Sequence, residues 1–461
     1  MRKLYHLIRE ALRDTERDYT AMGMRQAIVL LSIPMILEMG MEALFAIVDI
    51  FFVSRVGENA TSTVGITESM LVITYSLAWG LGMGATALVA RRTGEKDKEG
   101  ARTGAAQGVF VAFAIGLLLA IPGTIFAPQL LGLMGAEPGV IAEGSNYARL
   151  MMASNVIIML LFAINASFRG VGRANMALWS LGLANLINIV LDPLLIFGIG
   201  PFPEMGVTGA ACATTIGRGC GVAFQLYHLF KADGPFAMRM PDLRPVWAVI
   251  KSILQVAVGG AGQFLIPSLS WLFLYRIIAE SGTAAVAGYT VAIRIIIFAL
   301  LPAWGMANAA ATLVGQNLGA GQPDRAQRST WLCGHYNMVY MLIVTFIFWA
   351  ASPWIVSFFS QSAAADATAI LALRVISAGY LFYGYGMVLA QAFNGAGDSM
   401  TPTWLNVIGF WIIEIPLAYV LAKTFDMGPL GVFLSIAISE SILAVMCAVV
   451  FQRGRWKLVK V

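Results

Sequence analysis

Runs of about twenty apolar residues recur about twelve times along this chain of 461 residues, which is 59% hydrophobic and only 12% charged. Soluble domains carry about twice that charged fraction. A helix of about twenty residues is long enough to cross a bilayer. Period-2 alternation is absent, and only helices or closed barrels satisfy backbone polar groups in lipid. The sequence therefore predicts an all-α polytopic membrane protein.

The apolar runs predict twelve transmembrane helices arranged as two six-helix bundles. The expected spans are 27–54, 62–90, 103–126, 145–167, 174–198, 206–230, 252–279, 286–315, 330–352, 367–392, 401–423 and 429–451. Residues 1–25 are charged and predict an amphipathic arm in the cytoplasm. A polar, proline-containing linker at 231–250 divides an amino-terminal lobe, 26–230, from a carboxy-terminal lobe, 251–461.

An internal repeat makes the two bundles pseudo-symmetric. Three segment pairs match, two at an offset of 225 residues and the third three residues short of it: FRGVGRANM (168–176) with FNGAGDSMT (393–401), 77–94 with 302–319, and EMGVTGA (204–210) with DMGPLGV (426–432). One offset shared by separate places indicates a duplicated unit. Two like halves in so apolar a chain are typical of a transporter.

Lysine and arginine set the expected orientation. They gather in the arm, in the loop after the second helix, in the linker and in the tail, and they are sparse in the opposite loops. The positive-inside rule places both termini in the cytoplasm of a multi-pass protein of the cell (inner) membrane. This bias explains the net charge of +5, so no nucleic acid is expected as a partner. No obligate protein partner is implied.

The first helix carries an acidic stripe. Glu38, Glu42, Phe45 and Asp49 fall within about 60° of one another on a helical wheel. An ionisable side chain at membrane depth costs at least about 2.5–3.5 kcal/mol, so each is a functional candidate. Such a stripe requires a water-filled cavity or partners on other helices.

The fifth helix supplies a second polar group, Asn188 and Asp192, which are four residues apart and share a face. Asn165 on the fourth helix and Thr214 on the sixth add an amide and a hydroxyl. The second copy is apolar at the matching places, with Leu274, Ala390, Trp411 and Ile415 in place of Asp49, Asn165, Asn188 and Asp192. The fold evidently forms without these groups, and we therefore interpret them as functional candidates.

The residues resemble the multidrug and toxic compound extrusion (MATE) transporters. The resemblance rests on VDIFFVSRVG (48–57), the FRGVGR…LDP run, and FNGAGDSMTPTWLNVIGFWIIEIPLAYVLA (393–422). It implies a two-lobe, twelve-helix exporter that exchanges amphipathic, mostly cationic compounds for protons or sodium. It also implies that Asp49 is the coupling acid, together with Asn188, Asp192 and Asn165.

Two departures from the family pattern bear on coupling. Phe45 stands where the first helix often has a tyrosine, and the seventh helix has Gln263 in place of an acid. The apolar span of the tenth helix, 367–393, also contains no Asp or Glu. The chain thus resembles members with a coupling aspartate in the amino-terminal lobe more than the typical sodium-driven subgroup.

Burial favours the neutral form of a carboxyl group, and two neighbouring acids favour a shared proton. Asp49 and Asp192 are therefore expected to carry a proton. The same oxygens, with Asn188 and a hydroxyl of Thr214 or Thr215, also suit sodium as a hard cation. We favour the proton because the carboxy-terminal acids of the sodium-driven subgroup are absent. No cofactor or other metal is expected.

Substrate contacts are expected from soft, aromatic and acidic side chains. The candidates are Phe45, Met41, Glu38, Glu42, Gln263, Tyr380 and Glu414. For Gln263 and Glu414, helix-to-helix hydrogen bonding is the alternative. Glu68 and Arg294, at nearly matching places in the two lobes, suggest a gate, unless each pairs within its own lobe.

Two other functions compete with this interpretation. A lipid-linked oligosaccharide flippase would bind an anion through Arg218, Arg276, Arg294 and Arg374, but the acidic stripe disfavours it. An enzyme is not expected, because the only histidines, His6, His228 and His335, lack metal-binding spacing.

Overall fold

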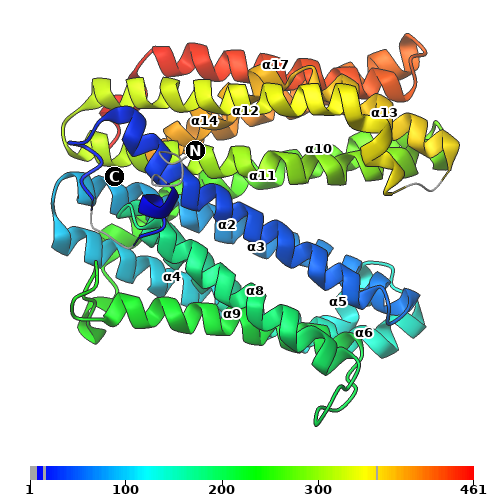
Figure 1. Ribbon diagram of the computed structural model, residues 1–461, viewed down its shortest axis with the longest axis horizontal. Helices are drawn as coiled ribbons and strands as arrows, with labels where there is room; N and C mark the ends of the chain where they lie inside the picture. Colours follow the sequence, from blue (N-terminus) through cyan, green and yellow to red (C-terminus); the bar gives the residue numbers. More distant parts are fainter. Residues whose placement is uncertain (1–7, 14–16, 360–361, 461) are drawn as a thin grey trace.

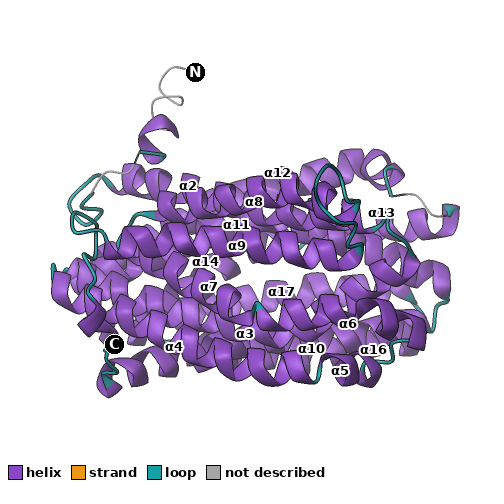
Figure 2. Ribbon diagram, turned by 90° about the horizontal axis from the view of Figure 1, so that it is seen from below, coloured by secondary structure: helices purple, strands orange, loops and turns teal. Residues whose placement is uncertain are grey.

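A computed structural model describes residues 8–13, 17–359 and 362–460, and these are mostly helical, with no strand among them (Figure 2). The long helices are α2 (Met24–Val53), α3 (Glu58–Gly94), α4 (Lys98–Ile125), α6 (Pro138–Ala153), α7 (Asn155–Gly170), α8 (Ala174–Ile196), α9 (Val207–Phe230), α10 (Trp247–Ala279), α11 (Thr283–Gly319), α12 (Pro323–Ser357), α13 (Ala363–Ser377), α14 (Tyr380–Ala396) and α17 (Pro429–Gln452). The shorter helical segments are α5 (Ala127–Leu133), η1 (Met240–Leu243), α15 (Met400–Asn406), η2 (Val407–Glu414), α16 (Ile415–Tyr419), η3 (Val420–Thr424) and η4 (Arg455–Leu458).

These segments provide the twelve spans of a polytopic membrane protein. Within the described residues, nine helical spans are long and apolar enough to cross a bilayer, and the bent pair α13–α14 makes a tenth. Helices α2 and α9, of 30 and 24 residues, run alongside them and have the length for the remaining two. The predicted all-α polytopic fold is confirmed.

Several helices extend beyond the predicted apolar spans. Helix α12 begins at Pro323, seven residues before the predicted start, and α6 begins at Pro138, also seven residues early. Helix α10 begins at Trp247, inside the predicted linker. Helices end where the backbone hydrogen bonds end, whereas hydropathy detects only the part inside the lipid. The tenth span is also bent by 62° between α13 and α14, which a hydropathy window does not register.

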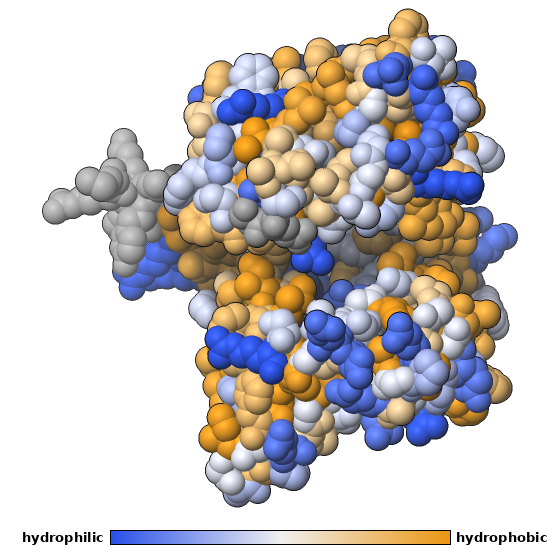
Figure 3. Space-filling model, turned by 90° about the vertical axis from the view of Figure 1, so that its right-hand side faces the viewer, coloured by the Kyte–Doolittle hydropathy of each residue, from blue (hydrophilic) through white to orange (hydrophobic). Residues whose placement is uncertain are grey.

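The two halves of the chain form two lobes (Figure 1). Helices α2–α9 make the amino-terminal lobe, drawn below, and α10–α17 make the carboxy-terminal lobe, drawn above. The lobes meet where α2 packs on α11 and where α3 packs on α10 and α11. The described parts of the arm and of the tail lie at the same end of the molecule. Seen from the opposite end, the surface is hollowed between the lobes (Figure 3).

The contact between the lobes is built on glycines related by the repeat. A Cβ atom on Gly94 would collide with the backbone of Gln316, and one on Gly319 would collide with the backbone of Arg91. Each of these contacts is the 225-residue image of the other. A side chain on Gly305 would likewise meet the α2 backbone at Met35 and Ile36. Helices α3 and α11 therefore cross with their backbones nearly touching at the end that bears the termini.

The arm and the tail close the same end. The Tyr19 hydroxyl donates to the Gly172 carbonyl at 3.1 Å, and Arg325 donates from the other lobe to the Tyr19 carbonyl at 3.2 Å. Arg91 donates to the carbonyl of Val459 in the tail at 2.8 Å. Tyr19 is buried, so this part of the arm is inserted between the lobes and does not lie on the surface as an amphipathic helix. Residues 1–7 and 14–16 of the predicted arm lie outside the described residues.

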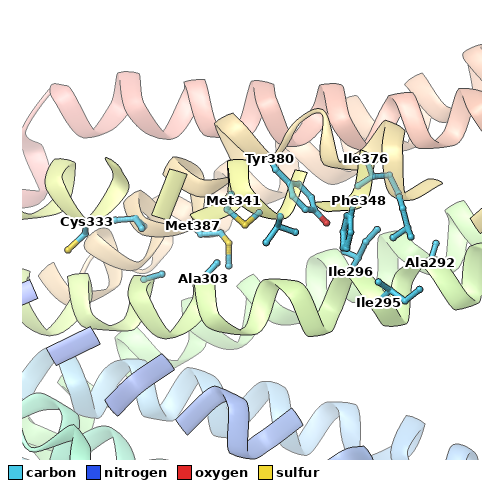
Figure 4. Close-up of a cluster of buried hydrophobic side chains, with 14 of the residues drawn as sticks. Ala292, Ile295, Ile296, Ala303, Cys333, Met341, Phe348, Ile376, Tyr380 and Met387 are labelled. Carbon is cyan, nitrogen blue, oxygen red and sulfur yellow. The ribbon is translucent and has the colours of Figure 1, made fainter. Parts of the chain in front are cut away.

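The carboxy-terminal lobe has an apolar core that extends to the lobe interface. Phe348, Ile376, Met341 and Met387 contribute to it, and Tyr380 reaches inward among them (Figure 4). All four cysteines are free, and Cys333 and Cys447 are buried.

Adding one methyl group at the lobe crossing should destabilise the protein. We expect Gly94→Ala to lower the free energy of unfolding by about 1–3 kcal/mol, because the new Cβ overpacks the contact with Gln316. The measurement is the thermal unfolding midpoint of purified protein in detergent. Gly65→Ala is the matched control, because Gly65 lies in the same helix with open space around it. Equal midpoints for the two variants would contradict the crossing.

Candidate functional site

Four of the predicted coupling residues form one hydrogen-bonded chain across three helices of the amino-terminal lobe. The Thr214 hydroxyl on α9 donates to Asp49 Oδ1 on α2 at 3.2 Å. The Asn188 amide on α8 donates to Thr214 Oγ1 and to Asp192 Oδ1, both at 3.3 Å. The two carboxyl groups are therefore linked through one amide and one hydroxyl. We name these four residues the Asp49–Asp192 cluster.

The cluster is buried, and some oxygens in and beside it have no hydrogen-bond partner among the described residues. Asp49 is 9% exposed, and Asp192 and Asn188 are fully buried. Asn188 Oδ1, Asp192 Oδ2 and the neighbouring Thr215 hydroxyl have no hydrogen-bond partner among the described residues. Pro193 lacks an N–H group and so cannot bond the carbonyl of Ile189 in the same stretch of α8. Oxygens in this number suit a proton or a hard cation.

Arg218 lies beside the acidic stripe of α2. The sequence suggests this arginine only for the flippase alternative. Arg218 on α9 donates to the Tyr75 hydroxyl at 3.0 Å, and its guanidinium carbon lies 4.8 Å from the centre of the Phe45 ring. It lies within electrostatic range of Asp49 and Glu42. The acidic stripe of α2 thus faces a basic side chain from its own lobe, and Phe45 already has a cation on its face.

Glu38, at the other end of the stripe, forms a buried ion pair. Its Oε1 accepts from Arg169 Nη1 on α7 at 2.6 Å. The repeat places Gln263 and Asn394 at the matching positions of the other lobe, and these two exchange a pair of hydrogen bonds, both 2.9 Å long. Both lobes therefore tie their first and fourth spans together at the same point. This arrangement favours a structural tie for Glu38, and for Gln263 the helix-to-helix alternative that the sequence left open.

Other predicted residues lie apart from the cluster. Asn165 accepts a hydrogen bond from Gln225 and makes none with the four cluster residues. The Met41 carbonyl accepts from Asn185 at 3.1 Å. Tyr380 and Glu414 lie buried in the carboxy-terminal lobe, and their side-chain oxygens have no hydrogen-bond partner among the described residues. The roles of these residues stay predictions.

The predicted gate residues are exposed and face one another without an ion pair. Glu68 and Arg294 lie in the two different lobes, within electrostatic range. No pair of their atoms comes within 4.0 Å in this open arrangement of the lobes. A contact between them requires the lobes to approach at the hollowed end.

Glu440 is a half-buried acid that was not among the residues predicted to be functional. Glu440 lies on α17, within the predicted span 429–451, and its Oε2 atom is inaccessible and unpartnered among the described residues. A charge inside an apolar span was the available signal. Among the described residues, no group of three or more His, Cys, Asp or Glu side chains is placed to hold a metal ion.

Breaking the Glu38 tie should destabilise the protein strongly. Glu38→Gln leaves Arg169 buried without an acid, which typically costs about 3–5 kcal/mol. The double variant Glu38→Gln/Arg169→Asn copies the Gln263–Asn394 pair and should recover much of that loss. The measurement is again the unfolding midpoint, with Glu280→Gln as control because its ion pair with Lys423 is exposed and such pairs contribute about 0–1 kcal/mol. A double variant less stable than Glu38→Gln would contradict the matched tie.

The chain is similar to known transporters along nearly its whole length. The chain is 27% identical to the probable multidrug resistance protein NorM of Thermotoga maritima over 94% of this chain and 93% of that protein. It is 26% identical to an FAD transporter of Shewanella oneidensis, over 89% and 90% of the two chains. A multidrug resistance MATE family transporter of the MOP superfamily, solved in an outward-facing conformation, matches with a TM-score of 0.88 and 28% identity, over 95% of this chain and 97% of that one. The MatE family itself matches residues 34–194 and 261–420, once in each lobe, and the chain is therefore a membrane transporter of the MatE family.

Proposed function

We propose that this transporter exports amphipathic, mostly cationic organic compounds in exchange for a cation, the proton being favoured over sodium. The observation that carries the proposal is the buried Asp49–Asp192 cluster, in which hydrogen bonds join two carboxyl groups, and Asp192 Oδ2 and Asn188 Oδ1 have no partner among the described residues. Relatives named for multidrug resistance support export as the activity. The cluster is the only part of the proposed cycle that needs to change charge.

The distribution of basic residues supports the proposed orientation in the cell membrane. The arm, the loop after α3, the linker and the tail carry most of the lysines and arginines. The positive-inside rule favours a cytoplasmic position for these basic segments. The lobe crossing at Gly94 and Gly319 then seals the cytoplasmic side, and the hollowed end faces outward.

Exchange follows from competition for negative charge. A proton that enters from outside and binds the Asp49–Asp192 cluster neutralises it, and a bound organic cation then loses its counter-charge and leaves. Loss of that proton to the cytoplasm restores the site for the next substrate. Arg218 stabilises the ionised form of Asp49 and so opposes the binding of either cation. The preference for the proton rests on Gln263 in place of an acid on the seventh span and on the absence of Asp and Glu from residues 367–393.

The position of Arg218 also supports an anionic substrate as the alternative. Its guanidinium stacks on Phe45, the aromatic face proposed for substrate. One relative is named as a transporter of FAD, a compound that carries phosphates. A lipid-linked oligosaccharide flippase would use the same arginine to bind pyrophosphate. The four acids at or near Arg218 (Glu42, Asp49, Glu68 and Asp192) outnumber it and favour the organic cation.

Replacing the coupling acid should abolish transport without loss of the protein from the membrane. We expect Asp49→Asn to eliminate ethidium export from vesicles on which a pH gradient or a sodium gradient is imposed separately. Wild-type export should follow the pH gradient alone. Glu280→Gln, which removes an exposed acid, is the matched control and should export normally. Wild-type rates for Asp49→Asn would refute the scheme, and dependence on sodium alone would refute the proton as the coupling ion.

Removing the guanidinium should separate the two substrate classes. We expect Arg218→Gln to bind ethidium several-fold more tightly, because the acids near Phe45 lose their internal counter-charge. Equilibrium dye binding to purified protein measures this, with Arg276→Gln, an exposed arginine of the other lobe, as control. Unchanged dye binding together with lost binding of an anionic flavin nucleotide would instead favour an anion as substrate.

A further inference from the structure

The carboxy-terminal lobe contains one buried and one half-buried acid that the proposed cycle does not use. Glu414 is 1% exposed, and both of its carboxylate oxygens lack a hydrogen-bond partner among the described residues. Glu440, on the neighbouring helix α17, is half-buried, with its Oε2 atom inaccessible and unpartnered. Each lies within electrostatic range of the other. Helix α17 packs directly on η2, the segment that Glu414 ends.

The backbone around Glu414 is unusual. Segment η2 (Val407–Glu414) is a π-helix, followed by Pro416 near the start of α16. Single π-helical turns inside α-helices occur frequently at functional sites. The wider turn and the proline together set Glu414 facing the interior of the lobe, where its carboxyl group is shielded from lipid and from solvent.

Tyrosines surround the two acids. The hydroxyls of Tyr289 and Tyr380, both 3% exposed, have no hydrogen-bond partner among the described residues. Tyr289 lies in electrostatic range of Glu414, Tyr380 in range of Glu440, and Tyr383 in range of both acids. Figure 4 shows Tyr380 directed into the lobe interior. The remaining titratable neighbours are Cys447, near Glu440, and Tyr275, whose ring lies 6.2 Å from that of Tyr289.

No described basic side chain compensates these acids. Neither carboxyl group forms an ion pair, and no arginine or lysine lies within electrostatic range of either. The third repeat pair, in which 204–210 matches 426–432, places Glu440 at the position of Arg218. One lobe thus has an arginine among its acids, whereas the other has a second acid at the same point.

Two carboxylates without a counter-ion cannot both stay ionised at membrane depth. We propose that Glu414 and Glu440 form a second proton-binding site, in which at least one carboxyl group is protonated and can donate to its partner or to a tyrosine oxygen. The proton comes from water and adds to a carboxylate to give a carboxylic acid, with no other reactant. This site is separate from the Asp49–Asp192 cluster and does not depend on the proposed substrate.

The test is infrared spectroscopy of the purified protein near pH 7, without drug or gradient. Glu414→Gln and Glu440→Gln should each reduce or shift the C=O stretching band of protonated carboxylic acids, because each removes one acid or its hydrogen-bond partner, and the double variant should lose that component completely. The double variant should also release one proton fewer per protein when the solution is made strongly alkaline. Glu280→Gln is the matched control, because its ion-paired, exposed carboxylate does not contribute to the band.

Two results would overturn the second site. One is a band whose intensity and position match those of wild type in each single variant that folds. A single folded variant is enough for this comparison. The other is loss of the band when sodium is added to wild type, which would make the pair a sodium site. Neither measurement involves transport. The result for the second site is therefore independent of whether the Asp49→Asn variant exports ethidium.

Discussion

The close crossing of α3 and α11 is the contact on which the two-lobe architecture depends. Gly94 lies on the backbone of Gln316, and Gly319 lies on the backbone of Arg91, so that each lobe contributes the same contact in opposite directions. A crossing of this kind leaves no space for side chains at one end and allows the helices to diverge toward the other. The hollow between the lobes follows from that geometry.

The repeat shows which polar contacts belong to the fold and which do not. Glu38–Arg169 and Gln263–Asn394 differ in charge but join the same helices at the same point. A contact that is retained while its chemistry changes is part of the scaffold. Asp49 and Asp192, in contrast, are matched by Leu274 and Ile415, so that no polar contact survives in the second lobe. The fold therefore does not require the Asp49–Asp192 cluster, although burying its two acids costs free energy.

The helices, the two lobes and the members of the Asp49–Asp192 cluster could be predicted from the sequence. The contacts that could not be predicted depend on packing between helices. Twelve apolar spans and a fixed offset predict the helices and the two lobes, because both signals are local or repeated. Asp49, Asn188, Asp192 and Thr214 could be grouped because helical spacing put each on a polar face. The partner of Glu38 could not be found, because Arg169 ends a different helix and only packing brings the two together. The sequence offers Arg218 only as an anion-binding candidate, because its position over Phe45 requires coordinates.

The two lobes manage buried negative charge in opposite ways, and this difference bears on how they move. In the amino-terminal lobe, Arg218 balances part of the acidic stripe, so the proposed gain or loss of one proton at Asp49 would change a site that is already partly neutral. In the carboxy-terminal lobe, Glu440 occupies the equivalent place, and only protonation or a cation can offset its charge. A lobe with its own counter-ion can be ionised or neutral while it stays packed, as a cycling site requires. A lobe without one is held to the neutral state by the cost of burial, and it can release its proton only when the lobes rearrange and admit water.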